Sequence, residues 1–214
     1  MRTVYIIDSN YPKDHYVDRA DGPIAQQILK ALGIRADLRM ALDREYFKKA
    51  VTRATAAGCD VLHISCHGDK DGVGLCNDDP DNEEAPQGYE WEEFVGLFQG
   101  KYEPPEALVM SACCGAASGL GHAFAKAKKR PSIIIGSRDK RFAADYVAAW
   151  SLLYRAFKRS GIHQEVAQEV LEAICAVVDK NFRYLRWSDE KQRYLQYPSA
   201  GKLYEVREKK KKAK

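Results

Sequence analysis

The chain has 214 residues, of which 45% are hydrophobic and 30% charged, and its formal net charge is +4. This length suits one domain with a core of its own, and the apolar stretch Thr3–Ile7 is too short for a signal-peptide core or a membrane span. The charge does not indicate a nucleic-acid-binding surface, because the last eight residues carry +5 and the rest of the chain therefore sums to −1.

These properties predict one domain over residues 1–206, followed by a basic flexible tail over residues 207–214. We expect a cytoplasmic protein with no specific nucleic-acid partner and no membrane partner. The six cysteines are expected to be free thiols, because several of them lie inside apolar segments, and the cytosol does not favour disulfides.

Short apolar runs alternate with stretches of helical periodicity along most of the chain. The expected strands are residues 3–8, 36–40, 60–65, 107–111 and 132–136, and the expected helices are residues 23–32, 44–57, 91–98, 119–129, 143–160 and 164–178. Residues 181–198, rich in aromatic and charged side chains, are expected to form a terminal strand or hairpin. The alternation predicts an α/β fold in which helices cover both faces of a mostly parallel sheet of about five or six strands.

One connection, residues 68–88, is longer than most loops between a strand and a helix. Its acidic residues do not follow the spacing of a calcium-binding loop. We therefore expect a solvated loop there. The acidic residues concerned are Asp78, Asp79, Asp81, Glu83 and Glu84.

Reactive side chains follow two of the predicted strands. "HISCHG" ends in His67 and Gly68, and "MSACCG" ends in Cys113, Cys114 and Gly115. In an open parallel sheet, ligands bind beyond the carboxyl ends of the strands. If the two strands are neighbours, an imidazole that can take up a proton lies beside a thiol that can attack a carbonyl.

These two motifs resemble those of the caspase-like cysteine peptidases, in which a histidine precedes a Q-A-C-x-G motif by roughly 50 residues. Here "HISCHG" precedes "SACCG", and 46 positions separate His67 from Cys113. The CHAT-type branch is the most similar, because its strand ending in S-A-C follows a strand ending in H-G, with a G-L strand between them similar to "GVGL". The resemblance extends over about residues 3–161 and implies a caspase-like three-layer sandwich.

The resemblance also implies a role for each matched residue. Cys113 would be the nucleophile, His67 the general acid and base, and the backbone N–H groups of Gly68 and Cys113 the oxyanion hole. Cys114 falls in the variable position of the motif and has no chemical role. Ser111 replaces the glutamine of the caspases, so the caspase preference for acidic residues should not be carried over.

The loops after the first and fifth predicted strands usually contact the substrate side chain in this fold. Asp18, Asp21 or Asp139 would favour a basic residue before the scissile bond, whereas Arg19, Arg138 or Arg141 would favour an acidic one. The sequence does not choose between them.

No metal or cofactor is expected. His63 and His67 lie on a strand, where a separation of four residues places the two imidazoles roughly 13 Å apart, and the adjacent cysteines lack the gap that is usual in zinc sites. His63 is instead interpreted as a structural histidine within its strand.

The sequence thus predicts a cysteine endopeptidase that cleaves a protein substrate with a Cys113–His67 dyad. The resemblance suggests a bacterial effector in antiviral defence or cell death, and we expect it to be poorly active until an activating protein partner or the substrate itself orders the loops around Cys113. The alternative is a catalytically silent module of the same fold that binds a partner. A flavodoxin-like ligand-binding domain is disfavoured, because no glycine-rich phosphate loop follows the first strand.

Overall fold

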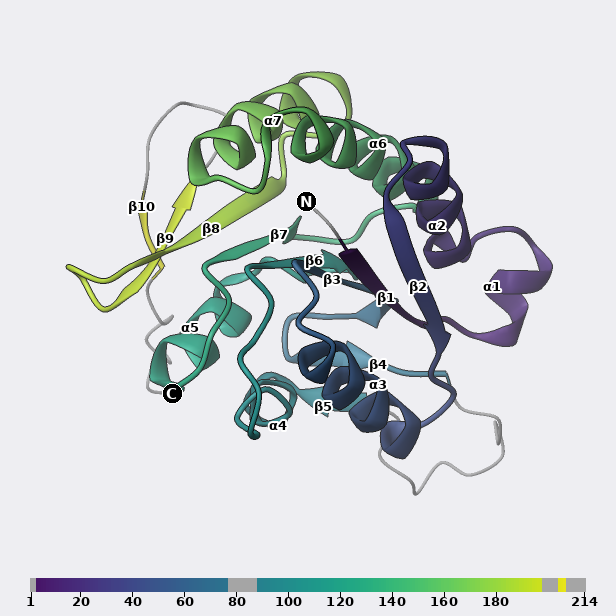
Figure 1. The fold of residues 1–214 in the computed structure, drawn as a ribbon, viewed down its shortest axis with the longest axis horizontal. Helices are drawn as coiled ribbons and strands as arrows, with labels where there is room; N and C mark the ends of the chain where they lie inside the picture. The colour runs from purple at the N-terminus through teal and green to yellow at the C-terminus, as the bar shows by residue number, and fades with distance from the viewer. Residues whose placement is uncertain (1–2, 77–87, 198–203, 207–214) are drawn as a thin grey trace, which may run out of the picture.

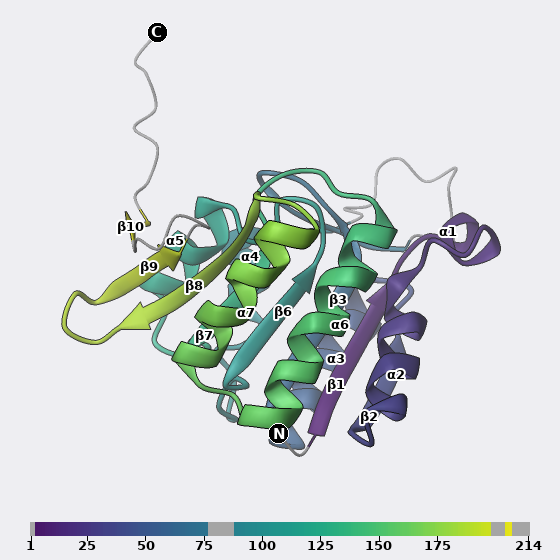
Figure 2. The ribbon, with the colours of Figure 1, turned by 90° about the horizontal axis from the view of Figure 1, so that it is seen from above.

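The computed structural model describes residues 3–76, 88–197 and 204–206, and it places one sheet between two layers of helices (Figure 1, Figure 2). The strands are β1 (Thr3–Ser9), β2 (Arg35–Met40), β3 (Val61–Gly68), β4 (Gly72–Gly74), β5 (Gly88–Glu90), β6 (Ala107–Ser111), β7 (Ile133–Ser137), β8 (Phe182–Ser188), β9 (Arg193–Tyr197) and β10 (Tyr204–Glu205). The helices are α1 (Pro12–Tyr16), α2 (Asp21–Ala31), α3 (Arg44–Ala56), α4 (Trp91–Gly96), α5 (Ser118–Lys126), α6 (Ala143–Ser160) and α7 (Gln164–Val177).

The main strand order of the sheet is β10-β9-β8-β7-β6-β3-β1-β2. The five strands at one end of this order, β2-β1-β3-β6-β7, are parallel, which confirms the five predicted strands and the mostly parallel α/β architecture. The sheet is wider than expected, because β8 pairs antiparallel with β7 and β9 folds back along β8. Strands β8 and β9, over residues 182–197, therefore form a hairpin that extends the sheet, which is the hairpin alternative of the prediction for this segment.

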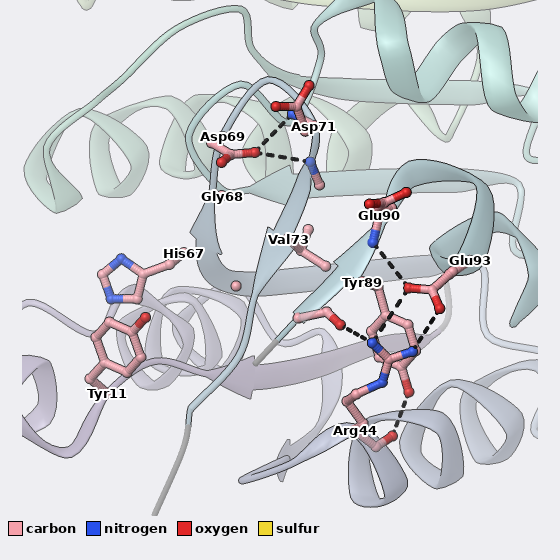
Figure 3. Close-up of a pocket in the computed structure, with 13 residues that line it drawn as sticks. Tyr11, Arg44, His67, Gly68, Asp69, Asp71, Val73, Tyr89, Glu90 and Glu93 are labelled. Atoms are coloured by element: carbon pink, nitrogen blue, oxygen red, sulfur yellow. Dashed lines mark hydrogen bonds and ion pairs between the residues drawn. The ribbon is translucent and has the colours of Figure 1, made fainter. Parts of the chain in front are cut away.

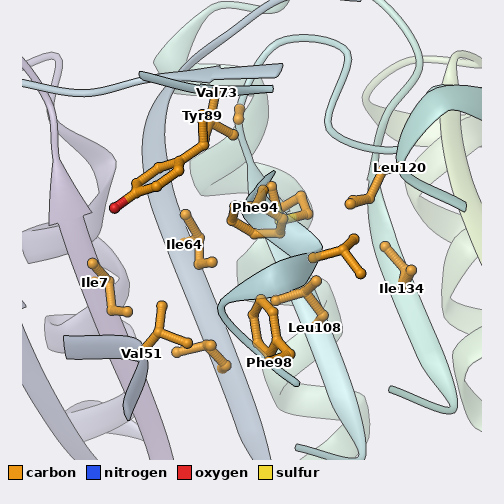
Figure 4. Close-up of a cluster of buried hydrophobic side chains, with 14 of the residues drawn as sticks. Ile7, Val51, Ile64, Val73, Tyr89, Phe94, Phe98, Leu108, Leu120 and Ile134 are labelled. Atoms are coloured by element: carbon orange, nitrogen blue, oxygen red, sulfur yellow. The ribbon is translucent and has the colours of Figure 1, made fainter. Parts of the chain in front are cut away.

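The strands are apolar on both faces because each face is covered by helices. In β1, Tyr5 and Ile7 belong to the core beneath α3, α4 and α5, whereas Val4 and Ile6 belong to the core beneath α2, α6 and α7. Figure 4 shows the first of these cores, where Phe94 and Phe98 lie over the strands. Full burial of one such phenylalanine contributes about 2–3 kcal/mol to stability.

Helix boundaries agree with local signals in the sequence. The carboxylate of Asp43 accepts a hydrogen bond of 2.8 Å from the N–H of Tyr46 and so caps the start of α3. Helix α6 ends at Gly161, whose φ of 84° suits a residue without Cβ.

Two short elements, β5 and α1, were not predicted from the sequence. The loop expected over residues 68–88 contains β4 and β5, in which Gly72 lies so close to β5 that a Cβ atom there would be 2.1 Å from the carbonyl oxygen of Tyr89. Strand β4 lies where the resemblance implied a strand at "GVGL", whereas β5 has only three residues and is too short to show a periodic pattern in the sequence. The acidic residues of this loop and the basic tail lie outside the described residues.

Helix α1 is the other unexpected element. It has five residues and none of them is buried, so it lacks the apolar periodicity by which longer helices are predicted. Pro12 in its first turn is the one local signal for its start. This helix follows β1 at the edge of the sheet where the candidate site lies.

Within the ranges described, no helix combines the length and the apolar character that crossing a bilayer requires.

Candidate active site

The ends of β3 and β6 bring His67 and Cys113 to the same place. The two strands are parallel neighbours, with His63 opposite Val109 and Ser65 opposite Ser111. His67 follows Ser65 by two residues within β3, and Cys113 follows Ser111 by two residues in the turn after β6. Both side chains line one cavity together with Asp21 of α2 and Tyr146 of α6, so they lie on the side of the sheet that these two helices cover.

Gly68 is in close contact with the backbone at Cys113. A Cβ atom at position 68 would be 2.6 Å from the carbonyl oxygen of Cys113 and 3.2 Å from Cβ of Ala112. Only glycine fits this approach, because real Cβ atoms are not found so close to a backbone oxygen. The glycine of "HISCHG" thus lets the strand ends meet.

The turn after β6 has an unusual backbone at Cys114, where φ is 61°. A non-glycine residue in this left-handed region costs of order 1 kcal/mol and is often found at functional sites. The N–H of Cys114 donates to the carbonyl oxygen of Asp139 at 3.1 Å, and the N–H of Ala116 donates to that of Ser137 at 2.8 Å. These bonds fix the turn that carries Cys113 against the loop after β7.

His67 has two neighbours that the sequence did not predict. Its Nε2 lies 2.7 Å from Oδ2 of Asp14 in α1, and its ring stacks on Tyr11 with 4.2 Å between ring centroids. Asp14 precedes His67 by 53 positions, and no motif links the two, so only the fold reveals the contact. The imidazole remains 41% exposed and can be reached by a ligand.

The thiol of Cys113 is directed toward the loop after β7. Its Sγ donates to the carbonyl oxygen of Arg141 at 3.8 Å, a weak hydrogen bond that only the protonated thiol can make. Cys113 itself is half-buried.

A cavity of about 400 Å³ lies beside Cys113 and His67. Five of the predicted substrate-binding residues line it: Asp18, Arg19, Asp21, Ser111 and Arg141. The other two, Arg138 and Asp139, do not line it, so any contact they make with a substrate is not through this cavity. The remaining residues around it are Asn10, Asp14, Cys66, Phe142, Ala143, Ala144 and Tyr146.

Asp21 forms the floor of this cavity and is only 4% exposed. Its Oδ1 accepts a hydrogen bond of 2.6 Å from Ser65, and its Oδ2 accepts one from Ser111. Trp150 of α6 donates to the same Ser111 hydroxyl at 2.8 Å. The carboxylate of Asp21, at the start of α2, is therefore held in place by hydrogen bonds from β3 and β6.

A second carboxylate, Asp8, is completely buried at the end of β1. Its Oδ1 accepts from the N–H of Asn10 at 3.2 Å and lies 3.0 Å from Nε2 of His15. Burial raises the pKa of Asp8 above its ordinary value, more than these polar neighbours lower it.

His63 is a buried strand histidine, as predicted. Its Nδ1 is hydrogen-bonded to the hydroxyl of Tyr154 at 2.5 Å, and its Nε2 lies 3.6 Å from Oδ2 of Asp21. No group of three or more His, Cys, Asp or Glu side chains within the described ranges is arranged to hold a metal ion.

A larger groove of about 830 Å³ lies on the other side of His67, between β4, β5 and the start of α3 (Figure 3). The stacked rings of Tyr11 and His67 stand at one end of it. At the other end, Arg44 pairs with Glu93 at 3.0 Å and lies over the ring of Tyr89. His67 thus separates the small cavity from this groove.

Four of the other thiols have a pKa above that of an ordinary cysteine. Burial raises the pKa of Cys59 to about 12, and it raises the pKa of Cys66 and Cys175 as well. The pKa of Cys114 is raised by burial and by the neighbouring Cys113 thiol. Cys59, Cys66, Cys113, Cys114 and Cys175 are free thiols, as expected.

No family model and no curated protein matches the sequence. Solved structures do resemble the fold. A secreted C11 cysteine protease from Bacteroides thetaiotaomicron, bound to an irreversible peptide inhibitor, aligns with a TM-score of 0.58 at 11% identity over 86% of this chain and 66% of that chain. This chain has the caspase-like fold.

Two further structures support that assignment. An inactive zymogen C11 protease from Parabacteroides distasonis aligns with a TM-score of 0.55 at 12% identity over 86% of this chain, and the RgpB pro- and mature domains from Porphyromonas gingivalis align with 0.53 at 12% identity over 84%. This chain covers 61% of the first of these and 44% of the second, so it spans two thirds or less of each of the three structures. The identities are low enough that the likeness concerns the fold alone.

Proposed function

We propose that this protein is a cysteine peptidase in which Cys113 is the nucleophile and His67 the general acid and base. The observation that carries the proposal is the position of both residues at the ends of adjacent parallel strands, on one face of the sheet and around one cavity. Several solved structures with this fold are cysteine proteases, which is in accord with such chemistry.

In the proposed reaction, His67 takes the proton of the Cys113 thiol, and the thiolate attacks the carbonyl carbon of the scissile peptide bond. The C–N bond then breaks as His67 gives the proton to the leaving amine, which produces a thioester on Sγ. Water attacks the thioester, with His67 accepting its proton, and releases the new carboxyl end together with the regenerated thiol.

Asp14 acts as a positioning residue in this scheme. It accepts a hydrogen bond from Nε2 of His67, so Nδ1 is the ring nitrogen left to exchange a proton with Cys113. The carboxylate also stabilises the imidazolium that forms when His67 takes up the proton. In this proposal, Asp14 of α1 is therefore the third member of a triad with Cys113 and His67.

Activation also frees the thiol from Arg141. Once the proton has moved to His67, Sγ has no hydrogen to donate to the Arg141 carbonyl, and the thiolate can turn toward a substrate. We assign the oxyanion hole to the backbone N–H groups of Gly68 and Cys113, as the resemblance to caspase-like peptidases implies.

The CHAT-type assignment, a cytoplasmic location and the role of a regulated effector in defence or cell death are supported by sequence motifs alone. A protein substrate and an activating partner are proposed on the same basis. The alternative to a peptidase is a silent module that binds a partner through the same cavity.

Mapping of thiol alkylation by mass spectrometry tests the proposal. A peptidyl acyloxymethyl ketone should modify Cys113 at least about 10-fold faster than Cys114, because the raised pKa of Cys114 leaves less thiolate there. His67→Ala should remove this selectivity, and Cys113→Ala should abolish peptide cleavage while Cys114→Ala keeps most of it. Modification of Cys113 no faster than Cys114, together with no cleavage, would favour the silent module.

A further inference from the structure

The cavity beside Cys113 has negative charge at its floor without a cationic partner. Asp21 is 4% exposed, and Asp8 behind it is fully buried. In the part of the chain that the structure describes, no lysine or arginine forms an ion pair with either carboxylate. Buried carboxylates are normally paired with a cation, because their charge is poorly solvated.

The histidines nearby only partly fill that role. His15 lies 3.0 Å from Asp8 and is directed to that carboxylate rather than to Asp21. His63 lies 3.6 Å from Asp21, beyond hydrogen-bond distance, and its other ring nitrogen is engaged by Tyr154. The serine hydroxyls that bond to Asp21 are neutral. A carboxylate has room for further donors beyond these two hydrogen bonds.

Tyr146 is a second, independent observation that points to a polar ligand in the cavity. This residue of α6 lines the cavity and is 4% exposed, yet its hydroxyl has no hydrogen-bond partner among the described residues. Buried hydroxyls are nearly always hydrogen-bonded. Burial raises the pKa of Tyr146, so the group remains a neutral hydroxyl that can accept a hydrogen bond from a ligand.

The charged residues at the rim of the cavity do not offset the negative charge of Asp21. Arg141 is bound to Asp139 at 2.6 Å and to Asp179 at 2.9 Å, so its charge is already compensated from outside the cavity. Asp18 and Arg19 are exposed residues of opposite sign next to each other. An acidic ligand would bring another carboxylate against Asp21, whereas a cation would complete the pairing.

We propose that this cavity binds the cationic side chain, arginine or lysine, of the residue before the scissile bond, with Asp21 and Tyr146 as the specificity-determining residues. This inference rests on the proposed function, because it takes Cys113 as the group that attacks the substrate. The ammonium or guanidinium donates to Asp21 and to the Tyr146 hydroxyl, which gives each of these groups the partner it lacks. The sequence alone did not decide between a basic and an acidic residue before the scissile bond, and the cavity favours the basic one.

The test uses five peptidyl acyloxymethyl ketones that differ only in the residue next to the reactive group: arginine, lysine, citrulline, methionine and aspartate. Citrulline has nearly the shape of arginine without its charge. Rates of Cys113 modification in the purified protein should be at least about 100-fold higher with arginine or lysine than with citrulline or aspartate. The ratio between the arginine and lysine probes shows which cation the cavity prefers.

Two variants assign the effect to the cavity. Tyr146→Phe removes only an unpartnered hydroxyl and should slow modification by the cationic probes about 10-fold, with no change for methionine. Tyr184→Phe is the matched control, because Tyr184 is another buried tyrosine with an unpartnered hydroxyl, and it does not line the cavity. Asp21→Asn should reduce the preference for arginine over citrulline to less than about 10-fold, with folding verified by the thermal midpoint.

The outcomes separate this inference from the proposed function. Rapid modification of Cys113 by all five probes, or a preference for aspartate, overturns the cationic pocket and leaves the peptidase proposal in place. No modification by any probe, in a protein that remains folded, overturns both. Selectivity that Tyr184→Phe alters as much as Tyr146→Phe would also overturn the assignment of the pocket.

Discussion

Adding one methyl group at position 68 tests the close approach of the strands that carry His67 and Cys113. In Gly68→Ala, the new Cβ would begin 2.6 Å from the carbonyl oxygen of Cys113, and an ordinary contact needs at least 3.4 Å. The two backbones must therefore separate by about 0.8 Å, since the obstructing atom belongs to the main chain and cannot rotate away.

A displacement of this size has different effects on activity and on folding. Misplacement of catalytic groups by about 1 Å lowers the rate about 100-fold, and one donor of an oxyanion hole is worth about 100- to 1,000-fold. We expect kcat/KM of Gly68→Ala to fall at least about 100-fold. Overpacking costs about 1–3 kcal/mol, and each kcal/mol lowers the melting temperature of a chain of this size by about 2–4 °C.

Gly96→Ala is the matched control, because a Cβ at that position in α4 would meet nothing within 4 Å. It should keep full activity and a melting temperature equal to or slightly above that of the unmodified protein. The assay is peptide cleavage beside thermal unfolding followed by circular dichroism. Unchanged activity and stability in Gly68→Ala would show that position 68 does not lie against the backbone of Cys113, and the register at the catalytic strand ends would be wrong.

Three further changes probe the neighbourhood of the site. Asp14→Asn should lower kcat about 100-fold or more with little change in KM, because the imidazolium of His67 loses its carboxylate; an unchanged kcat in steady-state assays would remove Asp14 from the mechanism. Asp8→Asn should raise the melting temperature at pH 7. Because burial raises the folded-state pKa of Asp8, its ionisation destabilises the fold as pH rises through that value, so the gain should vanish toward about pH 4. A lower melting temperature at pH 7 would mean that pairing with His15 outweighs burial. Cys114→Gly should raise the free energy of unfolding in urea by up to about 1 kcal/mol and preserve cleavage, because φ at this position is 61°; a loss of stability would contradict the left-handed turn.

The parts of the fold that the sequence predicted are those with strong local signals. Each central strand is a continuous apolar run, and His67 and Cys113 stand at the ends of two such runs, so strand pairing alone brings them together. Asp14 could not be found in this way, since α1 has no buried residue to give it a periodic pattern. Its contact with His67 exists only once the chain is folded.

The part that Tyr146 plays in the cavity could not be predicted from the sequence either. In the sequence it is one of several apolar positions at helical spacing in α6, and its hydroxyl gains meaning only when it lies unpartnered beside Asp21. Arg141 and Asp139 are residues that the sequence suggested for substrate binding and that have partners within the fold. Both were candidates for contact with the substrate, and the structure pairs them with each other.

Helix α1 is locally less stable than the sheet that carries the rest of the site. With no buried residue, it is held on the molecule by the stacking of Tyr11 on His67, by Asp14 and by the pairing of His15 with Asp8. Segments held by a few polar contacts open far more often than a buried sheet does. His67 can therefore lose its orienting carboxylate while every central strand stays intact, and amide hydrogen exchange would register that opening in α1 long before the core exchanges.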